Sequence, residues 1–161
     1  MSDDRQISNG HIVVGVDGSA EAAEAVIWAA NYSVATGSPL HFVHAWHLKA
    51  PSAEGVTAPF WQACTGDARA RATQWVLTAL ASTDAEHWTL HIVEGAPGPV
   101  LVERSDHASL LVLGAGAPTG SLLAAGAVLH YALSHAHPPV LAVRAGREPR
   151  HVAAARPDHG S

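Results

Sequence analysis

Five short apolar runs, each separated from the next by a stretch with helical spacing, constrain the fold of this chain more than any other feature. They cover residues 11–17, 39–46, 87–95, 109–114 and 138–145, and each predicts a strand. The run 11–17 is β-branched and mostly apolar, which predicts a strand buried on both faces. Strands that alternate with helices predict an α/β fold with a doubly wound parallel sheet.

The segments between these runs predict four helices. Ser19 can cap the first helix, and Gly37 can end it. The other helices are expected over residues 61–82, 97–106 and 120–136. Residues 48–60 contain two prolines and a glycine and are expected to form a loop. Ligands of doubly wound sheets sit at the carboxyl ends of the strands, so the turns after the strands are the places to look for a site.

Length and composition indicate one globular domain. The 161 residues are 48% hydrophobic, which is enough to bury a core. We expect a disordered tail over residues 1–10, a folded domain over 11–145 and a flexible tail over 146–161. The polar, acidic start does not resemble a signal peptide, and no apolar run approaches the length of about 20 residues that spans a bilayer. We therefore expect a cytoplasmic protein without membrane contact.

Charge, cysteine and histidine content narrow the function further. A net charge of -5 argues against nucleic-acid binding, which needs a basic surface. Cys64 is the single cysteine, so no internal disulfide is possible, and we expect a packed thiol in a reducing compartment. The spacing of His41, His44 and His47 would align on a helix, but their surroundings predict a strand. No metal site is expected.

Asp17 follows the first predicted strand and is the first candidate for a binding residue. Its carboxylate could bind a ribose hydroxyl or a metal at the carboxyl edge of the sheet. An aspartate before a glycine is also common in turns for local reasons. The sequence leaves both interpretations open.

A glycine-rich turn after the fourth predicted strand is the second candidate. Gly114, Gly116 and Gly120 would let backbone N–H groups approach an anion in front of the following helix. A P-loop is excluded because no lysine follows the last glycine, and "GAGAPTG" does not have the spacing of a dinucleotide-binding fingerprint. A plain strand-to-helix turn is the alternative.

The turn "EGAP" contains Gly95, which could allow a ligand to approach closely or could simply begin a helix at Pro97. No catalytic site is expected, since the G-x-S-x-G pattern of a nucleophile elbow is absent. Cys64 has no histidine partner nearby in the sequence.

These segments, in this order, resemble the universal stress protein family over residues 11–144. The opening strand, aspartate turn and first helix are matched by "IVVGVDGSAEAAEAVIWAA", and the second strand by "LHFVHAW". The third helix, the fourth strand and the last helix and strand are matched by "EGAPGPVLVERS", "SLLVLGAGA" and "GAVLHYALSHAHPPVLAVR". The resemblance implies five parallel strands in the order 3-2-1-4-5, helices on both faces, and a homodimer through the strand 138–145.

The resemblance also implies a site for ATP or another adenine nucleotide. Asp17 matches the aspartate that faces the ribose, with Val16 beside it. Ala45 matches the position whose backbone meets adenine, and Gly95 lies next to it.

The family's phosphate pattern, G-x2-G-x9-G-(S/T), is incomplete in this chain. Gly114 and Gly126 match its first and third glycines, but the spacing is one residue short. Ala117 replaces the second glycine, and Ala127, followed by Val128, replaces the hydroxyl residue. Gly116 and Gly120 could serve in a shifted register.

The function predicted from this resemblance is a stress-response protein that binds ATP or AMP and acts as a regulatory dimer rather than as an enzyme. Its protein partners are not indicated. The alternative is the same fold used as an interaction module that has lost nucleotide binding. An ATP-pyrophosphatase is a third hypothesis, but its S-G-G-x-[DS] loop is absent.

Overall fold

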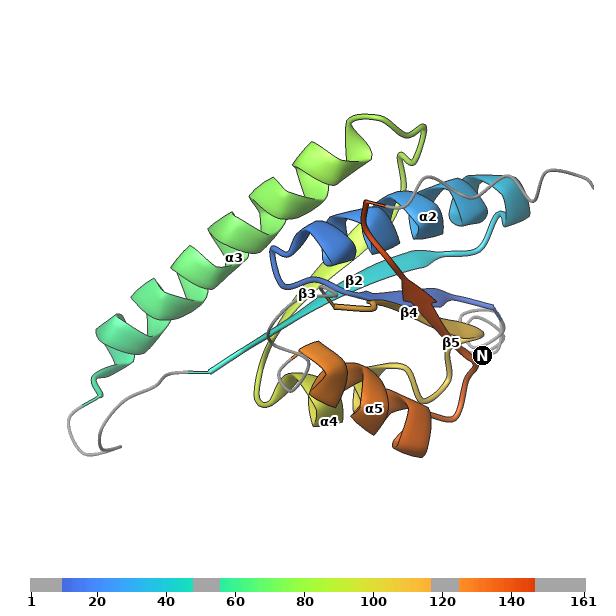
Figure 1. Cartoon of the computed structure of the whole chain (residues 1–161). Coiled ribbons are helices and arrows are strands. Elements are labelled where there is room, and N and C mark those ends of the chain that lie inside the picture. The colour runs from blue at the N-terminus through green and yellow to red at the C-terminus, as the bar shows by residue number, and fades with distance from the viewer. Residues whose placement is uncertain (1–9, 48–55, 117–124, 147–161) are drawn as a thin grey trace, which may run out of the picture.

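A computed structural model describes residues 10–47, 56–116 and 125–146. These residues contain a parallel five-stranded sheet in the order β3-β2-β1-β4-β5 (Figure 1). The strands are β1 (Ile12–Gly15), β2 (Leu40–Trp46), β3 (Trp88–Glu94), β4 (Leu110–Gly114) and β5 (Val140–Val143). The predicted fold class and strand order are confirmed.

Helices cover both faces of the sheet, as expected. They are α2 (Ala20–Thr36), α3 (Ala58–Leu80), α4 (Pro97–Arg104) and α5 (Ala125–His135). Figure 1 shows α2 and α3 on one face and α4 and α5 on the other. Side chains alternate along each strand, so neighbours such as Val13 and Val14 enter different apolar clusters. Every residue of β1 is buried, which explains its unbroken apolar run.

Local signals predicted the ends of α2 correctly. The Ser19 hydroxyl accepts a hydrogen bond from the backbone N–H of Ala22 at 3.1 Å. Gly37 ends the helix with φ at 72°, and its N–H donates to the carbonyl of Ser33. Both caps satisfy backbone groups that a helix leaves without partners inside the helix.

The predicted loop over residues 48–60 is wrong at its end, because α3 begins at Ala58. Thr57 caps this helix, and its hydroxyl accepts from the N–H of Phe60 at 3.3 Å. Pro59 lies in the first turn, where the missing N–H of proline costs no helical hydrogen bond. Pro59 therefore belongs to the start of a helix and not to the predicted loop.

Several expected segments are shorter than predicted or lie outside the described residues. β1 ends before Val16, and β5 begins after the two prolines at 138–139, which have no N–H for the ladder. The start of the predicted helix 120–136 and nearly all of both predicted tails lie outside the described residues. Within the described residues, no helix is long and apolar enough to cross a membrane.

Candidate functional site

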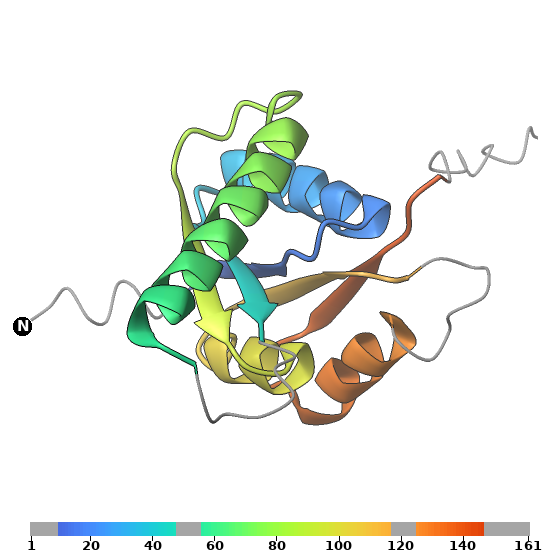
Figure 2. The same cartoon turned by 90° about the vertical axis from the view of Figure 1, so that its left-hand side faces the viewer.

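A cavity of about 440 Å³ lies at the carboxyl ends of β1, β2 and β4. Figure 2 looks toward the arrowheads of β2 and β3, with α2 and α3 on one side of the sheet and α4 and α5 on the other. Because β1 pairs with both β2 and β4, the cavity lies where the strand order reverses, the usual ligand position in a doubly wound sheet. Its lining residues are Gly15, Val16, Asp17, Ser19, Glu21, Ala22, Val43, Ala45, Pro97, Leu101, Leu113, Gly114, Gly116 and Val128.

Asp17 has a role in the turn and also borders the cavity. Its Oδ1 atom accepts hydrogen bonds from the backbone N–H of Ser19 at 2.9 Å and from the Ser19 hydroxyl at 2.6 Å. Those bonds hold Ser19, which in turn caps α2. The side chain is exposed at the cavity edge. The two interpretations of Asp17 are therefore compatible, because one carboxylate oxygen can serve the turn while the residue faces the cavity.

His44 holds the backbone next to Asp17 in place from the face of the sheet opposite to the cavity. Its Nδ1 atom lies 2.7 Å from the carbonyl oxygen of Val16 and donates to it in the tautomer that carries the proton there. The ring of Trp75 packs edge-on against the His44 ring, with centroids 5.3 Å apart. This buried contact fixes the chain where it leaves β1 and enters the cavity wall.

At two of the predicted glycines, close packing by itself explains why the residue has no side chain. A Cβ atom on Gly114 would lie 2.8 Å from the backbone nitrogen of Ala22, so any larger residue would push β4 away from the start of α2. Gly95 has φ at 143°, and its Cβ would lie 2.8 Å from the Val100 side chain. Gly95 is not among the residues that line the cavity.

The predicted phosphate segment is only partly described. Gly116 lines the cavity with φ at 79°, and Val128 lines it from α5. Gly126 and Ala127 lie in the first turn of α5 but are not lining residues. Ala117 and Gly120 lie outside the described residues.

Sequence reasoning missed part of the cavity wall. Pro97 and Leu101 come from α4, and Glu21 comes from the first turn of α2. The signal for Glu21 was its place directly after the aspartate turn, since the first turn of a helix that follows a strand lies near the carboxyl edge. Among the described lining residues, the ionisable side chains are two carboxylates, Asp17 and Glu21, and none is Lys or Arg.

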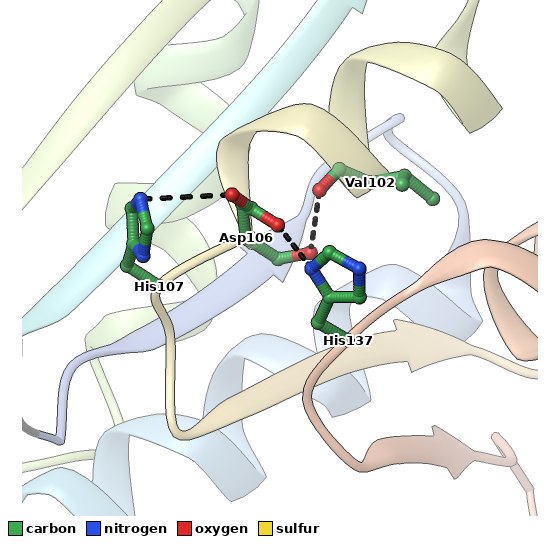
Figure 3. A network of polar contacts seen from close by, with 5 residues as sticks. Val102, Asp106, His107 and His137 are labelled. Carbon is green, nitrogen blue, oxygen red and sulfur yellow. Dashed lines mark hydrogen bonds and ion pairs between the residues drawn. The ribbon is translucent and has the colours of Figure 1, made fainter.

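Other polar groups lie away from the cavity. Asp106, after α4, contacts His137, before β5, through a close hydrogen bond, and His107 lies 3.6 Å from its other oxygen (Figure 3). Both histidines are highly exposed, so solvent weakens these contacts. In the described parts of the chain, no group of three or more His, Cys, Asp or Glu side chains is arranged to hold a metal ion. Cys64 is half-buried on α3.

Comparisons with known proteins match nearly all of the folded chain. A family model described as the universal stress protein family matches residues 8–144. Two curated universal stress proteins from strains of Mycobacterium tuberculosis are each 38% identical over 144 residues, covering 82% of this chain and 46% of their own length. The chain therefore spans about half the length of the curated relatives that it matches.

Solved structures show the same fold. A universal stress protein in complex with cAMP is 27% identical with a TM-score of 0.58, and the match covers 83% of this chain and 95% of that one. A universal stress protein from Lactobacillus plantarum is 22% identical with a TM-score of 0.68, covering 84% and 97% of the two chains. One from Archaeoglobus fulgidus in complex with dAMP is 21% identical with a TM-score of 0.60, covering 83% and 97%.

Proposed function

Because the chain belongs to the universal stress protein family, we propose that the cavity at the carboxyl ends of β1, β2 and β4 binds an adenine nucleotide. The observation that carries this proposal is the cavity itself, which lies at the reversal point of the sheet and has Asp17 on its edge. A relative that is 27% identical is in complex with cAMP, which supports an adenine monophosphate as the ligand class.

The walls of the cavity suit the two parts of a nucleoside differently. Val43, Ala45 and Leu101 supply an apolar surface on which an adenine ring can pack. The Asp17 carboxylate can accept hydrogen bonds from ribose hydroxyls, which are strong when the acceptor is charged. In this proposal the backbone around Val16 and Ala45 completes the nucleoside contacts.

The described residues offer less for binding the phosphates of the nucleotide than for binding the nucleoside. Asp17 and Glu21 are both acids, and like charges raise the free energy of a bound triphosphate. The backbone at Gly116 and the start of α5, with Gly126 and Ala127, remain the proposed phosphate contacts, together with Ala117 and Gly120 outside the described residues. We therefore propose AMP or a similar monophosphate as a better ligand than ATP.

We propose that the protein acts as a cytoplasmic regulatory homodimer and not as an enzyme. β5 pairs only with β4 in the described sheet and leaves its other edge open. Pairing of this backbone edge with the same edge of a second copy would remove both open edges. Nucleotide binding would then regulate the dimer, and the nucleotide would not be consumed in a reaction.

The direct test is to denature the purified protein and measure adenine absorbance and mass in the supernatant, followed by calorimetric titration with AMP. Ala45→Phe would fill the cavity and should abolish binding, whereas Ala63→Phe adds the same ring at an exposed position of α3 and should not. If no adenine is released and AMP produces no heat, the proposal fails, and the chain is an interaction module with this fold.

A further inference from the structure

We propose that a histidine pair, His41 on β2 and His91 on β3, makes the attachment of the edge strand β3 sensitive to acid. The pair lies away from the nucleotide cavity, so this inference does not rest on the proposed function. β3 contacts only β2 within the described sheet, and none of its residues is fully buried. Its seven-residue register with β2 is its one connection to the described sheet, so a contact across this pair that depends on protonation can change how firmly the strand is held.

The two rings meet through their edges. Nδ1 of His41 lies 2.9 Å from Nε2 of His91, whereas the ring centroids are 5.2 Å apart and the planes differ by 17°. Because the nitrogens are so much closer than the centroids, the rings point at each other nearly in one plane. One nitrogen donates its N–H, and the other accepts with its lone pair. The pair is a diagonal link across the ladder, since His91 is in register with Val43.

A third histidine extends this arrangement toward β1. The His11 ring packs edge-on against His41, with centroids 5.2 Å apart and planes at 73°. Alternation along the strands places the three rings on the face that Val13, Val43 and Val93 share, the face covered by α4 and α5. Three neighbouring segments of the sheet thus bring one histidine each to the same half-buried row.

Protonation changes what this pair can do. In the neutral pair, one of the two facing nitrogens carries a hydrogen and the other a lone pair, so the hydrogen bond forms. The bond is kept when one further proton binds to a ring nitrogen that does not face the other ring. When both rings are fully protonated, each facing nitrogen carries hydrogen, so no acceptor is left and two cations face each other at hydrogen-bond distance. The doubly protonated state therefore pushes β2 and β3 apart at this point.

The charged groups around His91 favour its neutral form. Burial lowers the pKa of His91 first, and the positive charges of Arg104 on α4 and Arg69 on α3 lower it further. Glu103, next to Arg104 on α4, is exposed, as is Asp67 on α3.

The surroundings of His41 act in the same direction. Burial lowers the pKa of His41 first, followed by the positive charges that His11 and His91 can carry. A cavity of about 630 Å³ beside His41 is also lined by Asp84, Glu86 and His87. All three of these side chains are exposed, so solvent screens their charges.

The sign of the pH effect follows from these lowered pKa values. A histidine with an ordinary pKa of 6.5 in the unfolded chain takes up its proton there at a higher pH than in the folded chain. The stability that the neutral pair contributes is complete above pH 6.5 and is lost as the pH falls toward the folded-state values. Over that interval each histidine raises the unfolding equilibrium constant by up to about tenfold per pH unit.

Hydrogen exchange read by mass spectrometry tests the local part of the proposal. Between pH 7.5 and 5.5, after correction for the intrinsic exchange rate, peptides from β3 should lose protection before peptides from β4. In His91→Gln the acid-induced loss in β3 should be several-fold smaller, because an amide can still bond to His41 but cannot gain charge. His130→Gln removes an exposed histidine of α5 and should behave like the unchanged chain.

A second measurement on the unchanged protein covers the case in which His91→Gln does not fold. NMR titration of the imidazole rings should place the pKa values of His41 and His91 below 6.5. Titration of both rings at or above 6.5 would overturn the proposal, and so would equal loss of protection in β3 and β4. Absence of AMP binding by the unchanged protein would overturn the proposed function but would leave this test unaffected, so the two proposals can fail separately.

Discussion

Replacement of Asp17 separates its two roles, one in the turn and one in the cavity. Asp17→Ala removes the acceptor of two hydrogen bonds, 2.9 Å and 2.6 Å long, that orient Ser19 as the cap of α2. Loss of a cap typically costs about 0.5–2 kcal/mol, so we expect the free energy of unfolding to fall by about 1 kcal/mol. Asp17→Asn keeps an acceptor oxygen and should cost less, because Asn serves such turns as well as Asp.

The nucleotide should respond to these changes differently from the fold. Both variants lose the charge on the proposed acceptor of the ribose hydroxyls, and a hydrogen bond to a charged group is worth about 1.5–3 kcal/mol. We therefore expect both to bind AMP roughly tenfold to a hundredfold more weakly than the unchanged chain. Calorimetric titration with AMP gives the affinity, and urea unfolding followed by circular dichroism gives the stability.

Asp67→Asn is the matched control, since Asp67 is an exposed aspartate on α3, away from the cavity. It should change neither the affinity nor the stability. Unchanged AMP affinity in Asp17→Asn would refute the ribose contact and leave Asp17 as a turn residue alone. If Asp17→Ala is as stable as the unchanged chain, the contribution of the turn to the cap of α2 has been overestimated.

The remaining predictions concern the phosphate end, the glycine at the end of β4 and the open sheet edge. ATP should bind less than about tenfold more tightly than adenosine. Glu21→Gln should improve ATP binding more than adenosine binding, because it removes a negative charge that repels the phosphates. Strong selectivity for ATP over adenosine in calorimetry would contradict both expectations. Gly114→Ala should destabilise the fold by about 1–3 kcal/mol in urea, because its Cβ would meet backbone 2.8 Å away, whereas Gly66→Ala on α3 meets nothing within 4 Å and should be neutral or stabilising. If the proposed dimer forms through β5, Ala142→Lys should shift it toward monomer in light scattering while the circular dichroism stays unchanged. A dimer that persists in this variant would exclude β5 as the interface.

Much of the fold was predictable from local patterns. The mostly apolar runs identify the strands, and β1, which is buried at every residue, shows no polar alternation at all. Ser19 and Gly37 mark the ends of α2, because capping depends only on residues within one or two turns. The strand order, in contrast, came from the resemblance to a family, since periodicity within a segment says nothing about which segments become neighbours.

Tertiary structure decided which residues meet. Glu21 and Leu101 join Asp17 around one cavity because the reversal of the sheet brings α2 and α4 to the same strand ends. His41 and His91 are 50 residues apart, and they pair only because the parallel register of β2 and β3 sets them diagonally across one face. Sequence periodicity assigns a side chain to a face of its own strand. Its neighbour depends on register and crossover, which the packing of the whole chain determines.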